Sequence, residues 1–107
     1  FSTDYDAVVL AKNFKVKSVI NLSNIDYLFD KDPKKFPEAK KIGNISWTEF
    51  RKMVGSKWDP GMNVPFDPIA SKIAHENNIQ VVIVNGKKLD NLVNILEGKK
   101  FNGTVIK

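Results

Sequence analysis

Cysteine is absent from this sequence of 107 residues, and histidine occurs once, as His75. Without cysteine the chain can form no disulfide framework, no thiolate metal site and no cysteine nucleophile. A single histidine argues against a histidine-based zinc site and against a Ser–His dyad. Any chemistry of this chain must therefore use carboxylates, lysines, hydroxyl groups and backbone amides.

Long apolar runs are also absent. No stretch approaches the ~20 apolar residues that span a bilayer, and no basic and then apolar leader opens the sequence. The composition, with 42% hydrophobic and 27% charged residues, is typical of a globular domain rather than of a disordered segment. We therefore expect a soluble, cytoplasmic protein in which residues 1–107 form a single domain.

The net charge of +5 is uneven, because residues 31–57 carry eight basic side chains against three acidic ones. Lys34 with Lys35, and Lys40 with Lys41, would attract phosphate or nucleic acid. Stacking aromatic residues do not alternate with these lysines, and the sequence forms no continuous basic stripe. A solvated loop is the favoured interpretation, and a basic nucleic-acid-binding domain remains an alternative.

Several helix ends are marked in the sequence. Thr3 followed by Asp4 gives an N-cap with an acidic first turn, where the helix dipole favours negative charge. Ser46 and Glu49 have capping-box spacing, and Pro68 suits a first helical position. A further apolar repeat with helical spacing ends before a glycine that suits a C-terminal cap. These signals predict helices at about 4–13, 46–55, 68–77 and 89–96.

Two β-branched apolar runs, at 17–22 and 79–84, predict strands. The second run, IQVVIV, is nearly continuous, which is typical of a strand buried on both faces in a parallel sheet. A short edge strand is expected at 103–106. The segment 28–37 is dense in turn formers and prolines, so we expect an irregular connection there.

This alternation of helices and strands predicts an α/β layered fold. In such sheets ligands bind outside the carboxyl ends of the strands, which here are the residues after Leu22 and Val84. Polar clusters lie at or beside this edge, at residues 23–26 and at residues 1–4. The sequence therefore directs attention to these two segments.

The start of the first helix is a candidate phosphate site. Ser2 and Thr3 add hydroxyl donors to free backbone N–H groups and the positive end of the helix dipole. Asp4 would not bind phosphate directly but would orient a lysine or a metal ion that does. A purely structural role, in which Thr3 caps the helix, remains the alternative. Neither GxxxxGKS/T nor GxGxxG occurs, which excludes a complete P-loop or Rossmann enzyme.

Residues 23–33, SNIDYLFDKDP, resemble the nucleotide-binding segment TNVDGVYxxDP of the amino acid kinase superfamily. The opening FSTD is similar to the FTTD of archaeal-type UMP kinases in that superfamily, and 22 residues separate Asp4 from Asp26, as in those enzymes. The segments DPIASK, IQVVIV and GTVI follow in the same order, so the resemblance covers essentially the whole chain. It implies a three-layer α/β/α sandwich with a mostly parallel sheet, of which this chain is the C-terminal half.

The resemblance implies a UMP-binding loop at Phe1, Ser2 and Thr3, with Thr3 near the acceptor phosphate. It also implies that Asp4 is the catalytic residue that organises the active-site lysine and the phosphates of Mg-ATP. The reaction would transfer the γ-phosphoryl group of ATP to UMP and give UDP, as in pyrimidine nucleotide biosynthesis. Mg2+ would be the cofactor, and no covalent enzyme intermediate would be needed.

The same resemblance implies an ATP site. Ser23 and Asn24 match a Thr-Asn pair that contacts ATP, Phe29 matches an aromatic residue beside the adenine, and Asp32 matches an acceptor close to the nucleotide. The N-terminal half of such kinases supplies glycine-rich phosphate loops and the catalytic lysine, so we expect this chain to be inactive alone. The implied partners are ATP, UMP, the N-terminal half and further copies in a homo-oligomer, which is a hexamer in the family.

Two residues depart from the family pattern. Tyr27 stands where the family has glycine, at a position that usually permits positive φ, so we expect a reshaped loop under the nucleotide. Phe29 replaces the commoner tyrosine, which keeps the stacking surface and removes a hydroxyl. Two alternatives remain open: a non-catalytic member of the fold that binds a nucleotide or an anion, and a sibling kinase with another small acceptor.

Overall fold

The computed structural model describes residues 3–23, 25–31, 34–57, 66 and 68–107, and for residues 3, 4 and 54–57 it describes the backbone alone. The helices are α1 (Thr3–Asn13), α2 (Trp47–Lys57), α3 (Pro68–Glu76) and α4 (Leu89–Leu96). The strands are β1 (Ser18–Ser23), β2 (Leu28–Phe29), β3 (Lys41–Ile42), β4 (Asn44–Ile45), β5 (Gln80–Asn85) and β6 (Thr104–Ile106). The predicted α/β class is confirmed.

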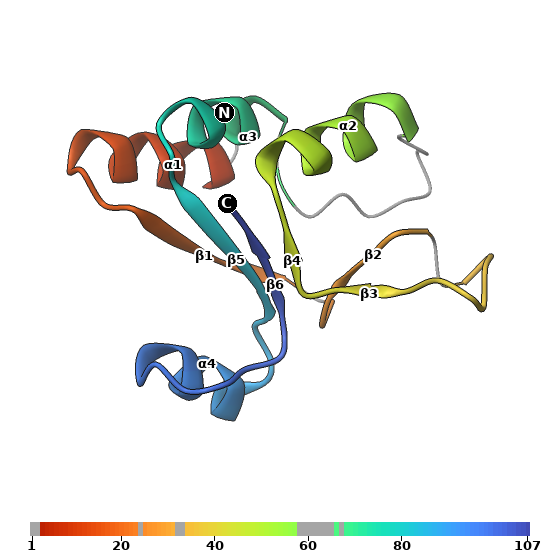
Figure 1. Cartoon of the computed structure of the whole chain (residues 1–107). Helices are drawn as coiled ribbons and strands as arrows, with labels where there is room; N and C mark the ends of the chain where they lie inside the picture. The colour runs from red at the N-terminus through yellow and green to blue at the C-terminus, as the bar shows by residue number, and fades with distance from the viewer. Residues whose placement is uncertain (1–2, 24, 32–33, 58–65, 67) are drawn as a thin grey trace.

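The central sheet of the described chain has four strands in the order β1-β5-β6-β4 (Figure 1). β1 pairs with β5 in parallel, from Ser18 opposite Gln80 to Ser23 opposite Asn85. β4 and β6 are also parallel, whereas β5 and β6 are antiparallel. β2 and β3 form a separate antiparallel ribbon. The sheet is therefore mostly parallel, as predicted, and β1 is one of its edges.

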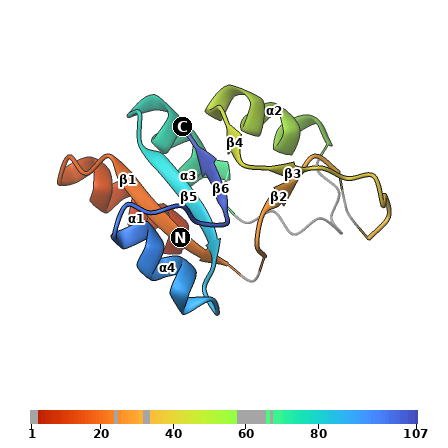
Figure 2. The same cartoon turned by 60° about the horizontal axis from the view of Figure 1, so that its bottom comes forward.

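Helices cover both faces of this sheet. α1, α2 and α3 lie on one side and α4 lies on the other, which gives three layers (Figures 1 and 2). Successive side chains of β5 point to opposite faces. Val81 and Ile83 belong to the core under α1 and α3, and Val82 and Val84 are buried outside that cluster, on the α4 side.

The hydrophobic core lies under α1, α2 and α3. Trp47, the first residue of α2, is buried in this core. Its indole Nε1–H donates to the carbonyl oxygen of Ile79 at 2.9 Å, which satisfies the polar end of the ring. Its ring meets Phe50 edge-on at a centroid distance of 5.8 Å. Alanines on α1 and α3 let these helices approach closely. The buried core side chains are Val8, Ala11, Leu28, Trp47, Phe50, Phe66, Ala70, Ala74, Ile79, Val81, Ile83 and Ile106.

Helix α4 is held differently. Its buried residue is the polar Asn91, whereas Leu89, Val93 and Leu96 are 69%, 47% and 72% exposed. Leu92 is half-buried. The apolar repeat that predicted this helix is therefore correct for the secondary structure, but most of the repeat does not pack on the sheet.

The predicted helices and long strands agree with the structure to within two residues at each end. The capping signal at α2 is confirmed, because the Glu49 N–H donates to Ser46 Oγ at 3.1 Å and the Phe50 N–H donates to the Ser46 carbonyl at 2.9 Å. These bonds satisfy backbone donors of the first helical turn.

One strand prediction was wrong. β6 is not an edge strand but lies between β5 and β4, because Asn44 pairs with Val105 and Ile45 with Ile106. The expected irregular connection at 28–37 also begins with a short strand, β2. Strands of two residues carry too little periodicity to be found without their partners.

Candidate functional site

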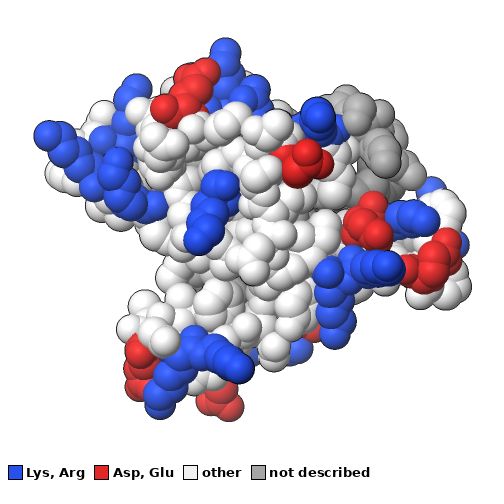
Figure 3. Space-filling model, viewed as in Figure 1, with Lys and Arg blue, Asp and Glu red and all other residues white. Residues whose placement is uncertain are grey.

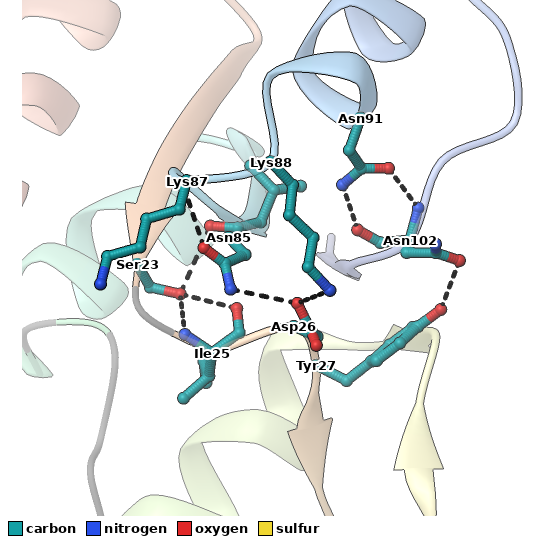
Figure 4. Close-up of polar contacts among 10 residues, drawn as sticks. Ser23, Ile25, Asp26, Tyr27, Asn85, Lys87, Lys88, Asn91 and Asn102 are labelled. Atoms are coloured by element: carbon teal, nitrogen blue, oxygen red, sulfur yellow. Dashed lines mark hydrogen bonds and ion pairs between the residues drawn. The ribbon is translucent and has the colours of Figure 1, made fainter.

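The carboxyl ends of β1 and β5 lie side by side at one edge of the sheet. Ser23 is opposite Asn85, and the Gly86 N–H donates to the Ser23 carbonyl at 2.9 Å. Ser23 Oγ accepts from the Ile25 N–H at 3.2 Å and also faces the carbonyl oxygens of Ile25, at 3.1 Å, and Val84, at 3.4 Å (Figure 4). This serine turn redirects the chain immediately after β1.

Asp26 follows this turn and reaches back to the end of β5. Lys88 Nζ lies 2.8 Å from Asp26 Oδ1, and Asn85 Nδ2 donates to the same oxygen at 3.1 Å. The hydrogen bond from Lys88, then that from Asn85, lowers the pKa of Asp26 below its ordinary value. The carboxylate is therefore ionised at neutral pH and is held by the turn between β5 and α4.

Tyr27 and Leu28 are held by the loop before β6 and by β6 itself. The Tyr27 hydroxyl donates to Asn102 Oδ1 at 2.7 Å, and Lys41 Nζ lies 5.0 Å from the Tyr27 ring centroid. The Leu28 N–H donates to the hydroxyl of the buried Thr104 at 2.9 Å. Among the described non-glycine residues positive φ occurs at two positions, and Tyr27 is not one of them. The tyrosine therefore replaces the family glycine without left-handed backbone strain.

The loop before β6 is attached to α4 and lies close to β5. The side chain of Asn91 donates to the Asn102 carbonyl at 2.6 Å and accepts from the Asn102 N–H at 2.7 Å. A Cβ atom at Gly103 would lie 2.5 Å from the Ile83 carbonyl oxygen, so that position accepts no side chain. Asn102, the partner of Tyr27, is thus fixed by α4 on one side and by β5 on the other.

The structure places only part of the predicted site. Phe29 is half-buried in β2, opposite Lys41 in the ribbon. Thr3 and Asp4 form the start of α1, which runs in the opposite direction to β1, so this helix begins at the end of the sheet where β1 stops (Figure 1). The predicted site residues Phe1, Ser2, Asn24 and Asp32 lie outside the described residues.

Sequence reasoning missed the partners of this segment. Asn85 directly follows Val84, where the sequence predicts a ligand site, but it was not among the predicted site residues. Lys88, Asn91, Asn102 and Thr104 carry no such signal, because each meets residues 26–28 or supports them only through the tertiary fold. A search for polar residues after each strand would have found Asn85 alone.

Other candidate features are weaker. The residues that the structure describes contain no group of three His, Asp or Glu side chains placed to hold a metal ion. On the face shown in Figure 3, lysine and arginine atoms form separate groups with acidic or uncharged surface between them. Across the described ranges, none of the helices has the length and apolar character needed to cross a membrane.

The chain therefore has an α/β fold with a mostly parallel sheet, and proteins of this class commonly bind ligands beyond the carboxyl ends of parallel strands. The sequence profile of the amino acid kinase family matches residues 1–85. The chain belongs to the amino acid kinase family.

Known relatives narrow the comparison within this family. The chain is 35% identical over 106 residues to a uridylate kinase of Thermotoga petrophila, which covers 99% of this chain and 42% of that protein. It is also 35% identical over 107 residues to a uridylate kinase of Methanocella arvoryzae, covering 99% of this chain and 47% of the relative. The chain therefore spans a little under half the length of these relatives.

Among solved structures, those of uridylate kinases are also similar to this chain. The crystal structure of uridylate kinase from Archaeoglobus fulgidus superimposes with a TM-score of 0.80 at 30% identity, over 100% of this chain and 47% of that one. The UMP kinase of Bacillus anthracis superimposes with a TM-score of 0.82 at 20% identity and shares the fold.

Proposed function

We propose that this chain is the C-terminal, nucleotide-binding half of a UMP kinase, which transfers the γ-phosphoryl group of ATP to UMP and forms ADP and UDP. The observation that carries the proposal lies at the carboxyl ends of β1 and β5, where Ser23 is opposite Asn85 and Asp26 accepts a hydrogen bond from Asn85. The 35% identity to uridylate kinases over 99% of the chain supports it.

The ATP site in this proposal follows the turn after β1. Ser23 and Asn24 contact ATP, Phe29 stacks beside the adenine and Asp32 accepts a hydrogen bond near the nucleotide. The half-buried Phe29 supports this role, because an aromatic ring offers a flat apolar surface to a base.

The acceptor site lies at the start of α1. Phe1, Ser2 and Thr3 bind UMP, and the free N–H groups and dipole of the helix N-terminus favour its phosphate. Asp4 orients a lysine from the rest of the enzyme and the phosphates of Mg-ATP. Phosphoryl transfer needs positioned charge rather than a protein nucleophile, so the lack of cysteine is no obstacle. Mg2+ enters as part of the substrate Mg-ATP, with phosphate oxygens among its ligands.

The proposal includes an N-terminal half that docks along β1. This strand is an edge of the sheet of described strands, and edge strands are where a further strand adds to a sheet. Large apolar side chains in β1 and in the residues before it are exposed to 49–75%, namely Leu10, Phe14, Val16 and Leu22. Burial of this surface would favour association. The complete enzyme is proposed to assemble further into a cytoplasmic homo-oligomer.

The test is to assay the intact protein for UDP formation from Mg-ATP and UMP, with this chain alone as the inactive control. A panel of nucleoside monophosphates and other small phosphate acceptors tests the acceptor. Failure to phosphorylate any nucleoside monophosphate would refute the proposal. ATP binding without turnover would identify a non-catalytic member, and strongly salt-dependent binding of RNA would identify a nucleic-acid-binding domain.

A further inference from the structure

Asp26, Tyr27 and Leu28, three consecutive residues of the proposed nucleotide-binding segment, are each held by a different part of the fold (Figure 4). Asp26 is held by Lys88 and Asn85, from the turn that begins α4. Tyr27 is held by Asn102, and the Leu28 N–H by Thr104 in β6. These partners lie 59–76 residues further along the chain than the residues they hold.

The holding groups are themselves fixed. Asn91, which is 8% exposed, makes two hydrogen bonds to the main chain of Asn102, so the partner of Tyr27 is anchored to α4. Asn85 Oδ1 also accepts from the Lys87 N–H at 2.9 Å, which shapes the turn before Lys88. Both attachments therefore transmit the position of α4 to residues 26 and 27.

The ion pair between Asp26 and Lys88 contributes little to the stability of the fold. Their side chains are 44% and 52% exposed, and pairs of that exposure contribute little to folding because water and salt screen them. Its geometry is nevertheless specific, since two donors converge on one carboxylate oxygen. A contact that fixes direction more than stability is suited to positioning a binding segment.

From these contacts we infer that Lys88 and Asn102 are positioning residues for ATP binding, which act through Asp26 and Tyr27 to fix residues 25–29 before the nucleotide arrives. This role rests on the proposed function. A preorganised segment loses less conformational entropy on binding, so the effect falls on nucleotide affinity. Tyr27 gives this chain an attachment that glycine at the same position has no side chain to make.

The experiment compares Lys88→Met with Lys87→Met in the intact protein. Lys87 is the matched control, because it precedes Lys88 and its side chain makes no ion pair with a described residue. We expect Lys88→Met to raise KM for ATP ~10-fold, with kcat, KM for UMP and Tm unchanged. Lys88→Arg should recover KM to within ~3-fold, since it keeps the charged donor, and Tyr27→Phe should raise KM ~3-fold.

A second measurement, made without nucleotide, separates this role from the kinase assignment. Amide hydrogen exchange at residues 25–29 should be faster in Lys88→Met than in Lys87→Met. Equal exchange rates and equal KM for ATP in the two variants would overturn the positioning role. A lower Tm of Lys88→Met, with KM raised equally for ATP and UMP, would also overturn it. If Lys88→Met exchanges faster but the intact protein makes no UDP, the proposed kinase function is refuted. The conclusion that Lys88 fixes residues 25–29 would still hold.

Discussion

The two faces of the central sheet hold their helices by different means. On one face α1, α2 and α3 enclose apolar side chains such as Phe50 and Ala74, which are 1% and 0% exposed. On the other face α4 buries Asn91 and leaves Leu89 exposed. Burial is non-directional and sets stability, whereas hydrogen bonds depend on direction and set geometry. Within the candidate nucleotide-binding segment, Asp26 and Tyr27 are attached on the α4 side by hydrogen bonds, whereas Leu28 is buried in the apolar core.

The largest expected effect is on the apolar face. Phe50→Ala should lower the free energy of unfolding by ~3–5 kcal/mol, because it removes a buried ring that packs against Trp47. Urea unfolding of the intact protein measures this loss. Phe36→Ala is the control, since Phe36 is 44% exposed and its truncation should cost below ~0.5 kcal/mol. Equal losses in both variants would contradict the assignment of the core.

A glycine substitution tests the close approach between the loop before β6 and β5. Gly103→Ala should cost ~2–3 kcal/mol, because the new Cβ would press on the Ile83 carbonyl, a backbone atom that cannot turn away. Gly43→Ala is the matched control, since a Cβ there meets nothing within 4 Å. Thermal unfolding of both variants gives the comparison, and a neutral Gly103→Ala would show that the loop is displaced easily.

Asn91 tests the polar attachment of α4. Asn91→Ala should cost ~1–2 kcal/mol, because it leaves the N–H and carbonyl of Asn102 without their partners. Asn94→Ala is the control on the same helix, because the Asn94 side chain forms no hydrogen bond with a described residue. Chemical denaturation measures both changes. If Asn94→Ala costs as much as Asn91→Ala, the two hydrogen bonds are not what holds the helix.

The smallest expected effect comes from the pKa of Asp26. Lys88, Asn85 and more weakly Lys41 lower this pKa below 3.8, so the small contribution of the contact to folding is present above that pH, is lost as pH falls through the lowered pKa, and is too small to change Tm. Carboxyl chemical shifts should titrate below 3.8, and Lys88→Met should move the midpoint upward. A midpoint unchanged by that substitution would contradict the pairing.

The same contrast explains what the sequence predicts. β5 is recognisable because burial on both faces leaves a continuous apolar run, and α2 because Ser46 and Glu49 lie three residues apart. β4 and the internal place of β6 escape prediction, since they depend on pairing between Asn44 and Val105. Sequence signals therefore predict elements that depend on neighbouring residues, and they do not predict pairing between distant strands.

The candidate site divides in a similar way. Ser23 and Asp26 are found from their place after a strand and from a motif, which are properties of neighbouring residues. The partner Asn102 is 75 residues from Tyr27, and nothing in the intervening sequence encodes that contact. Tyr27 donates a hydrogen bond to Asn102 and does not have a positive φ, and the reshaped loop stays a prediction.

The pairing of β1 with β5 also has a consequence for synthesis on the ribosome. Ser18 is 62 residues before Gln80, the residue opposite it in the ladder. At ~5–20 residues per second, β1 therefore waits roughly 3–12 s for its partner strand to be made. Throughout that interval β1 lacks the strand with which it pairs in the finished sheet, so codon changes that slow translation between residues 24 and 79 should prolong the time before this ladder forms.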